Sequence, residues 1–350
     1  MRFSAFGDVA MAVPVVYSLA KAYPDVRITV LSRGFARALF EDLAPNVNFM
    51  EADTKREYRG VKGLNALYRR LVAKNFTAVA DFHDVLRSKY LRVRFCMNGC
   101  RVEHIDKHRE GRRHLTDAGN RILQQQPTSF SNYADVLARL GYPVKVAFSS
   151  LFPAEGGNLN LLPAVFGPKR SGVEWIGIAP FAAHEGKIYP KEMMEAVLRM
   201  LSERHPKARL FLFGRGDSEE KVFTEWCKAM KCCIYVGKYL ETLHQELILM
   251  SHLDVMLSMD SANMHLASLT ATPVVSVWGA THPYAGFTGW GQKPSYFLQA
   301  DQPCRPCSIY GSKPCRRGDM ACMHLISPES VADKIDEVLS ERSGSHASAL

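Results

Sequence analysis

The chain has 350 residues, of which 47% are hydrophobic and 23% are charged, and its formal net charge is +9. These values are typical of a globular protein with room for two domains, and they exclude a disordered or fibrous chain. No apolar run approaches the ~20 residues that span a bilayer. Asp8 interrupts the apolar N-terminus too early for a signal peptide, so we expect a cytoplasmic protein.

The first half alternates short β-branched runs with helical patterns. Residues 27–32 and 77–82 predict buried strands, and such alternation predicts βαβ units with a parallel sheet. Pro14 is not tolerated inside a helix, so a helix should begin only a few residues before it. This start places Asp8 in the turn ahead of that helix, at the carboxyl end of a strand.

The positive charge is concentrated in one segment. Residues 54–114 contain 16 Lys or Arg against 6 Asp or Glu, a net charge of +10, which leaves the rest of the chain nearly neutral. A solvated face is the simpler interpretation of any single residue. An excess confined to one segment favours an anionic partner, either nucleic acid, anionic lipid or an acidic glycan. Few aromatic residues are interleaved with the basic ones, which disfavours nucleic acid.

The second half follows a stretch rich in Gly and Pro, residues 150–172, which predicts a linker. Further strands are expected at 175–179, 209–213, 233–236, 254–258 and 273–278. The predicted fold class is α/β, with two doubly wound domains. The expected bounds are 1–155 for the first domain, 173–327 for the second, 328–340 for a C-terminal helix and 341–350 for a disordered tail.

Asp8 is the first candidate for chemistry. Gly7 beside it permits an unusual backbone angle or the close approach of a ligand. A carboxylate here can accept the proton of an attacking hydroxyl, as a general base does. The alternative is that Asp8 only caps its helix, and the spacing does not decide between the two.

Two turns of the second half are candidates for anion binding. Residues 179–190 run from a strand into a small-residue loop that carries Lys187, and a lysine can offset the charge of a phosphate. Asp260 and Ser261 form a turn in which Ser261 is a good N-cap for a short apolar helix, and helix N-termini bind anions. Asp260 or His265 is placed to hold a sugar, although His265 taken alone is more typical of a buried, satisfied histidine.

A third turn, Phe213-Gly214-Arg215-Gly216-Asp217, also follows a strand. It is neither GxGxxG nor GxxxxGK[ST], which disfavours ordinary dehydrogenases and P-loop enzymes. One of Asp217, Glu219 or Glu220 is a candidate for a ribose hydroxyl pair, and a plain solvated turn is the alternative.

Nine cysteines without a secretion signal indicate reduced thiols. Cys304, Cys307, Cys315 and Cys322 supply the four ligands of an all-cysteine zinc site, but the second pair lacks the usual short spacing. We favour free or loop-stabilising thiols over zinc.

Taken together, these motifs resemble glycosyltransferase family 9, the ADP-heptose:lipopolysaccharide heptosyltransferases. The matching segments are RFSAFGDVAMAVPV, GIAPFAAHEGKIYP, MDSANMHLASLTATPVVSVWGATHP and the C-terminal CxxC…PCRRGDMAC region, in that order along the chain. The resemblance implies a GT-B fold, with two Rossmann-like domains and parallel sheets that face each other across a central cleft. It also implies an inverting enzyme that needs no metal and no cofactor.

Specific roles follow from the resemblance. It implies that Asp8 is the general base and that Lys187 binds the donor diphosphate. The donor site is expected at Gly7, Ala183, Gly214, Asp260, Ser261, Ala262, Met264 and His265.

The implied substrates are a nucleotide sugar, ADP-heptose, and an anionic lipid-linked glycan of the lipopolysaccharide core at the cytoplasmic face of the inner membrane. The alternatives are a sugar-nucleotide epimerase on the same fold and a non-catalytic protein that binds anionic glycans.

Overall fold

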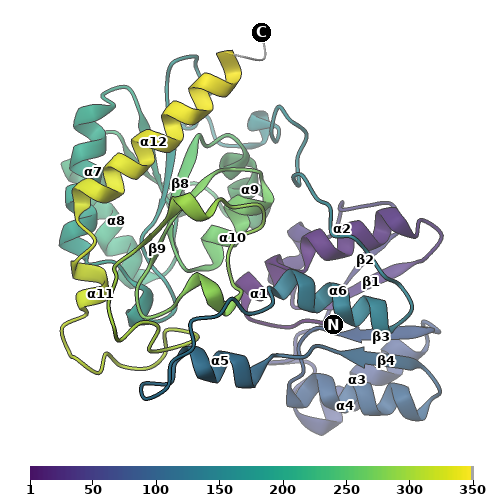
Figure 1. The fold of residues 1–350 in the computed structure, drawn as a ribbon. Coiled ribbons are helices and arrows are strands. Elements are labelled where there is room, and N and C mark those ends of the chain that lie inside the picture. Colours follow the sequence, from purple (N-terminus) through teal and green to yellow (C-terminus); the bar gives the residue numbers. More distant parts are fainter. Residues whose placement is uncertain (348–350) are drawn as a thin grey trace. The chain divides into compact units, whose positions relative to one another are not determined.

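The computed structural model describes residues 1–347, and the side chains of residues 1–342. The chain forms two compact units. Residues 1–108 and 127–151 make up the first, and residues 109–126 and 152–350 cluster as the second. Both units contain helices and parallel strands, so the fold is of the mixed α/β class (Figure 1).

The second unit contains a six-stranded parallel sheet in the order β10-β9-β8-β5-β6-β7. Its strands are β5 (Trp175–Ala179), β6 (Arg209–Leu212), β7 (Cys233–Tyr235), β8 (Val255–Met259), β9 (Val274–Trp278) and β10 (Phe297–Gln299). Every residue of β5, β8 and β9 is buried, as expected of parallel strands that helices cover on both faces.

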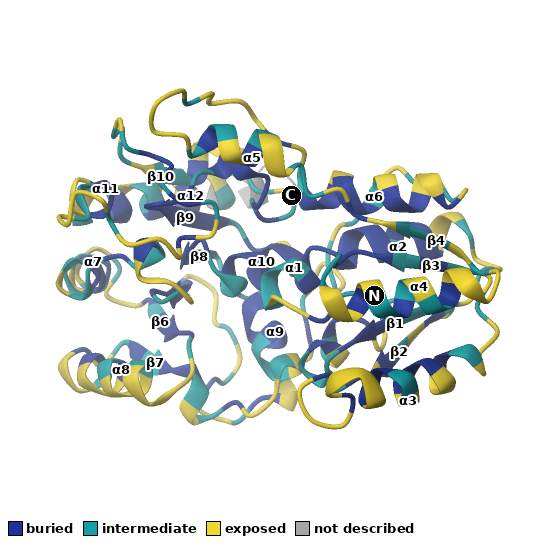
Figure 2. Cartoon of the chain, turned by 90° about the horizontal axis from the view of Figure 1, so that it is seen from below, coloured by how far each residue is buried: buried dark blue, intermediate teal, exposed yellow. Residues whose placement is uncertain are grey.

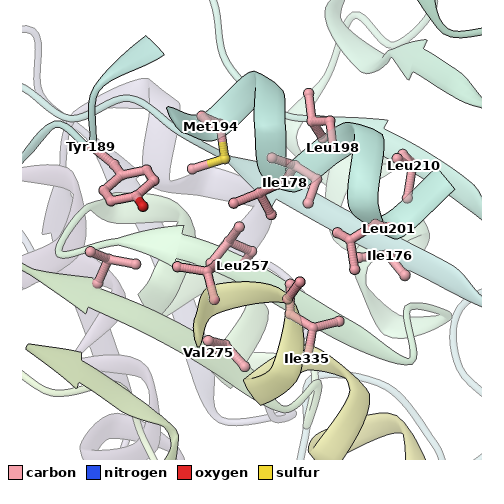
Figure 3. Packing of buried hydrophobic residues seen from close by; sticks show 14 of the residues in the cluster. Ile176, Ile178, Tyr189, Met194, Leu198, Leu201, Leu210, Leu257, Val275 and Ile335 are labelled. Carbon is pink, nitrogen blue, oxygen red and sulfur yellow. The ribbon is translucent and has the colours of Figure 1, made fainter. Parts of the chain in front are cut away.

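Helices cover this sheet. They are α7 (Lys191–Arg204), α8 (Asp217–Ala229), α9 (Leu243–Ser251), α10 (Ala262–Leu269), α11 (Ala321–His324) and α12 (Pro328–Ala347). Figure 3 shows side chains of α7, such as Leu198, and of α12, such as Ile335, meeting Ile178 and Leu257 of the sheet. Helix α12 lies beside α7 (Figure 1).

The strand order of the second unit changes direction at one point. From β5 the chain moves to β6 and β7 on one side, whereas β8 returns to the other side of β5 and leads to β9 and β10. The connections therefore diverge between β5 and β8. The crevice beyond the carboxyl ends of two such strands is the usual ligand site of open α/β sheets.

The first unit has two separate parallel pairs instead of one continuous sheet. Strand β1 (Ile28–Ser32) pairs with β2 (Val47–Glu51), and β3 (Ala78–Asp81) pairs with β4 (Arg101–His104). The surrounding helices are α1 (Phe6–Ala10), α2 (Val13–Ala22), α3 (Gly60–Val72), α4 (Leu86–Met97) and α6 (Ser129–Arg139). The strands of this unit are less uniformly buried than those of the second (Figure 2).

Three expectations about the chain need correction. Asp8 lies inside the five-residue helix α1 and not in a turn. The helix predicted to begin near Pro14 is a separate helix, α2, which begins at Val13 and has Pro14 in its first turn. The C-terminal helix does not end at 340: α12 continues to Ala347, so residues 341–347 are helical, and 348–350 lie outside the described residues. Glu341 explains part of this extension, because it accepts hydrogen bonds from Lys293 Nζ and Tyr296 Oη, both at 2.6 Å.

Residues 109–126, expected in the first domain, associate with the second unit instead. Helix α5 (Arg109–Leu115) places the buried Arg112 guanidinium 4.5 Å from the ring centre of Phe287. Further along, Gln126 N donates to Tyr284 O at 2.8 Å. Part of the basic segment thus belongs to the second unit.

Within the described residues, no helix combines the length and the apolar character that a membrane span requires.

Candidate functional site

Three strand ends of the second unit bring polar side chains together beside the divergence of β5 and β8. Lys187 follows β5, in the short 3-10 helix Glu185–Lys187, and its Nζ lies 2.9 Å from Oδ2 of Asp260, which follows β8. Thr281, which follows β9, donates its hydroxyl to the same oxygen at 2.8 Å. The Asp260 side chain is only 5% exposed and that of Lys187 15%. The buried carboxylate therefore fixes the lysine at this edge of the sheet.

Backbone contacts hold the lysine loop in place. Gly186 O accepts a hydrogen bond from Ala280 N at 2.8 Å, which ties the loop after β5 to the loop after β9. Gly311 has φ +77°, and a Cβ there would lie 2.6 Å from Lys187 Cγ. Glycine is thus required at 311 both by the backbone angle and by the approach of the lysine stem. Ala183, in the same loop, is exposed.

The tip of α10 lies directly after Asp260. Ser261 occupies the N-cap position as expected. Its hydroxyl lies 3.2 Å from Ser258 Oγ and, among the described residues, accepts no hydrogen bond from the first turn of α10. The N–H groups of the first turn, beginning at Ala262, are therefore left for another acceptor, and the helix dipole favours an anion there. The side chains of Met264 and His265 are buried.

The Gly214 turn lies beyond the end of β6, next to β5. A Cβ at Gly214 would lie 2.3 Å from a Glu219 carboxylate oxygen, which also accepts a hydrogen bond from Arg215 N at 2.9 Å. Arg215 pairs with Glu246 of α9, and burial raises the pKa of both Glu219 and Glu246. The exposed turn thus carries an acidic and basic cluster whose two glutamates are the more buried members. Glu246 was not among the residues that the sequence indicated.

Arg305 was also missed. It is buried, and its guanidinium donates to the carbonyls of Gly279, Ala300 and Thr281 and to Gln299 Oε1. These bonds hold the loop that carries Thr281. No local pattern marks this arginine, because its partners follow strands that lie before it in the sequence.

Asp8 and Gly7 lie in the first unit. The Asp8 side chain is 23% exposed, forms an ion pair with Arg2 and accepts a hydrogen bond from Ala5 N at 3.2 Å, while its backbone carbonyl accepts one from Tyr133 Oη. The Ala5 contact is a helix cap, so Asp8 does cap its helix, and its side chain is also partly open to solvent. Gly7 has helical backbone, so an unusual angle is not its reason for being glycine.

His83 lies beside this carboxylate and was not indicated by the sequence. Its Nδ1 accepts from Phe3 N at 3.4 Å, and its Nε2 lies 3.3 Å from Ser4 Oγ. Burial, with the nearby Arg2 as the next cause, lowers the pKa of His83 to about 4. The imidazole is therefore neutral near pH 7, and Arg2 remains the cation that faces Asp8.

The model of Glycosyltransferase family 9 (heptosyltransferase) matches residues 64–314, well over half of the chain. The chain belongs to this family of glycosyltransferases. A search of curated proteins finds no match.

Solved heptosyltransferases share the fold of this family 9 member. A family 9 glycosyltransferase from Veillonella parvula is 18% identical, with a TM-score of 0.71 and coverage of 97% of this chain and 96% of that one. E. coli heptosyltransferase WaaC, solved with ADP, is 18% identical, with a TM-score of 0.68 and coverage of 96% and 98%. E. coli ADP-heptose lps heptosyltransferase II is 16% identical, with a TM-score of 0.66 and coverage of 98% and 100%. The fold is thus of the GT-B type, with two Rossmann-like domains.

The four C-terminal cysteines of this family 9 chain line one small cavity of about 20 Å³ together with Gly186 and Ala280. All nine thiols are free. Within the described residues no three His, Cys, Asp or Glu side chains are grouped so as to hold a metal ion. The cysteine loop therefore lies against the lysine loop.

Proposed function

We propose that this protein transfers a heptose from ADP-heptose to a lipopolysaccharide core acceptor, with inversion at the anomeric carbon. The observation that carries the proposal is the meeting of Lys187, Asp260 and the α10 tip beyond the strand ends where β5 and β8 diverge. That arrangement provides positive charge and free N–H donors for a diphosphate at the position where sheets of this class bind ligands.

ADP-heptose is the preferred donor because relatives with the same fold have been solved with related molecules. WaaC has been solved with ADP and with ADP-2-deoxy-2-fluoro heptose. In this chain we assign the diphosphate to Lys187, to the backbone at Ala183 and to the first turn of α10 at Ser261, Ala262 and Met264. Lysine has three donors, and only one is needed by Asp260.

The rest of the donor site follows the strand edge. We assign the nucleoside to the Gly214 turn, where Glu219 or Glu246 accepts from ribose hydroxyls. We assign the sugar of the donor to Asp260 and His265, before and within α10. Gly7 lets the substrate approach the helix that carries Asp8.

In the proposed reaction Asp8 takes the proton of the acceptor hydroxyl as the oxygen attacks the anomeric carbon. The new glycosidic bond forms on the face opposite to the departing diphosphate, and the bond from the anomeric carbon to the phosphate oxygen breaks. Lys187 and the α10 dipole stabilise the charge that develops on the diphosphate. Because these groups do the work of a divalent cation, we propose a reaction that requires no metal and no cofactor.

A patch on α4 supports contact with a lipid-linked acceptor. Leu86, Val93 and Met97 recur on one face of α4 and are 84%, 56% and 80% exposed, while Leu91 and Phe95 on the other face are buried. Arg87 and Lys89 of the same helix are also exposed. An exposed apolar stripe flanked by cations is typical of a helix that binds anionic membrane surfaces. We propose that α4 docks on the membrane that holds the acceptor.

The donor is tested by calorimetric titration of the protein with ADP, UDP and GDP. We expect ADP to bind most tightly, and Lys187→Ala to weaken it at least about tenfold, because a charge-assisted contact of about 1.5–3 kcal/mol is lost. Lys191→Ala is the matched control, since Lys191 is a partly exposed lysine that pairs with Glu225. Equal affinity for the three nucleotides, or unchanged ADP affinity in Lys187→Ala, contradicts the donor assignment.

The base is tested by Asp8→Asn, which keeps the size of the side chain and removes its proton affinity. We expect transfer from ADP-heptose to fall by at least about 100-fold, within the range that general-base catalysis contributes, while ADP affinity stays within about twofold. Asp42→Asn, at an exposed aspartate of the same unit, should retain full activity. Substantial transfer by Asp8→Asn removes Asp8 from the mechanism and leaves it a helix cap.

A further inference from the structure

One buried cation of the second unit, Arg112 on α5, has no anionic partner among residues 1–342. The residue is only 7% exposed, yet within that range its guanidinium forms no ion pair and donates no hydrogen bond, and its Nε is buried without an acceptor. Arg305 is similarly buried at 6%, and its guanidinium donates to four oxygen acceptors. Buried charges are normally paired or hydrogen-bonded, so the exception at Arg112 calls for an explanation.

Stacking on an aromatic ring does not supply the missing partner. The guanidinium carbon of Arg112 lies 4.5 Å from the ring centre of Phe287, which is itself buried. An aromatic face attracts the positive charge, but it offers no oxygen to the five N–H donors of the guanidinium. The Phe287 contact therefore orients the cation and leaves its donors to be satisfied by something else.

The segment that carries this cation, residues 109–126, is fixed to the loops of the second unit by its own backbone and side chains. Near its end Gln126 N donates to Tyr284 O at 2.8 Å, in the loop after β9. Arg121 Nη2 donates to Cys304 O at 3.1 Å, in the loop after β10. These bonds hold the segment in place, so the guanidinium is positioned without any bond of its own.

The surroundings of Arg112 lead to the lysine loop of the candidate site. The ring of Tyr310, a residue that is 52% exposed, lies with its centre 5.7 Å from that of Phe287. The next residue, Gly311, is the one at which a Cβ would lie 2.6 Å from Lys187 Cγ. Of the three guanidinium nitrogens of Arg112, Nε alone is fully buried and unpaired among the described residues, so the two Nη groups stay within reach of a small ligand.

We propose that Arg112 is an oxyanion site, which binds a phosphate or carboxylate group through its two Nη groups. The planar guanidinium presents two parallel N–H donors that match two oxygens of such a group. The site is separate from the donor diphosphate, which we assign to Lys187. The oxyanion comes either from the glycan acceptor, in which case the inference rests on the proposed function, or from free inorganic phosphate.

The site is tested by calorimetric titration with inorganic phosphate. The titration is made in the Lys187→Ala protein, so that binding at the proposed donor site does not contribute. We expect the further change Arg112→Met to weaken phosphate binding at least about tenfold, because charge-assisted bonds to the anion are lost. Arg113→Met, at the exposed neighbour on α5, is the matched control and should leave phosphate affinity within about twofold. Equal phosphate affinity with and without Arg112→Met overturns the proposal.

Stability without phosphate separates an anion site from a structural arginine. Methionine fills much of the same volume and carries no charge into the interior, so Arg112→Met should melt at the same or a higher temperature than the unchanged protein in phosphate-free buffer. A Tm lower by about 5 °C or more would show that Arg112 stabilises the fold without an anion, and the proposal would fail. If Arg112→Met cannot be produced, Arg112→Gln carries the same two predictions.

A transfer assay with ADP-heptose and the lipopolysaccharide core acceptor distinguishes the two sources of the oxyanion. An acceptor KM raised at least about tenfold by Arg112→Met, with ADP affinity within about twofold, assigns the site to the acceptor. An unchanged acceptor KM together with lost phosphate binding assigns it to free phosphate. Absence of transfer by the unchanged protein would contradict the proposed function alone, because the phosphate titration uses neither substrate.

Discussion

At the scale of single residues, the neighbourhood of Asp8 is set by one cation and one neutral imidazole. Arg2 pairs with Asp8, while His83 is buried and accepts from Phe3 N. Because the pKa of His83 is lowered to about 4, the ring stays neutral over the range in which the enzyme is expected to work. A protonated His83 would place a second cation in a poorly solvated position beside Arg2.

The lowered pKa of His83 makes stability depend on pH. The unfolded chain binds a proton at this histidine below about pH 6.5, whereas the folded protein does so only below about 4, so the free energy of unfolding falls as pH drops through that window. Between pH 7 and pH 5 we expect a loss of about 2 kcal/mol that His83→Asn does not show. Urea unfolding at both pH values measures it.

His104→Asn, at an exposed histidine on β4, serves as the control and should keep the pH dependence of the unchanged protein. If His83→Asn loses as much stability on acidification as the unchanged protein, His83 is not the group responsible.

At the scale of elements, the proposed donor site of the second unit depends on loops rather than on the strands themselves. The loop after β9 is held by Arg305, whose guanidinium reaches four oxygen acceptors. The same loop carries Thr281, which donates to Asp260. A chain of contacts thus runs from Arg305 through Thr281 and Asp260 to Lys187, and the lysine keeps its place only while that loop does.

Arg305→Met retains much of the volume of the side chain and leaves the buried carbonyls of Gly279, Ala300 and Thr281 without their donor. We expect a destabilisation of about 3 kcal/mol or more and a weakening of ADP binding by about tenfold. Thermal unfolding and ADP titration measure the two effects. Arg316→Met, at an exposed arginine in the same stretch, should change neither. Normal ADP affinity in a folded Arg305→Met protein would show that the loop does not position the site.

At the scale of the whole molecule, the basic segment of residues 54–114 is divided between the two units. Arg112 of the basic segment is buried in the second unit against Phe287, and Arg92 of the first unit pairs with Asp81 and Asp84. The basic excess is therefore partly structural. The residues that remain exposed on α4, together with its apolar stripe, form the surface that we propose docks on a membrane.

Binding to vesicles made of equal parts phosphatidylcholine and phosphatidylglycerol tests the α4 surface. We expect the protein to sediment with these vesicles and the double variant Leu86→Ser, Met97→Ser to bind at least about tenfold more weakly, because two exposed apolar side chains no longer enter the lipid. Leu325→Ser, at a residue of the second unit that is 62% exposed, is the control. Equal binding by the double variant, or none by the unchanged protein, refutes docking through α4.

The strands of the second unit could be predicted from the sequence because each is a local, continuous apolar run. The strand predicted at residues 175–179 matches β5 at both ends. Each of the other four predicted strands begins and ends within one residue of the observed strand. The edge strand β10, with half-buried residues, carries no such run and was missed. In the first unit β2 and β4 were missed for the same reason, and the short sheet pairs could not be foreseen from alternation alone.

The sequence by itself determined the fold class, the family and the residue types at the strand ends, since these are written in local patterns and motifs. Only the tertiary structure decided that Lys187 pairs with Asp260, that Arg305 holds the neighbouring loop and that residues 109–126 join the second unit. These features depend on contacts between residues far apart in the chain, and such contacts leave no periodic signal in the segments that make them.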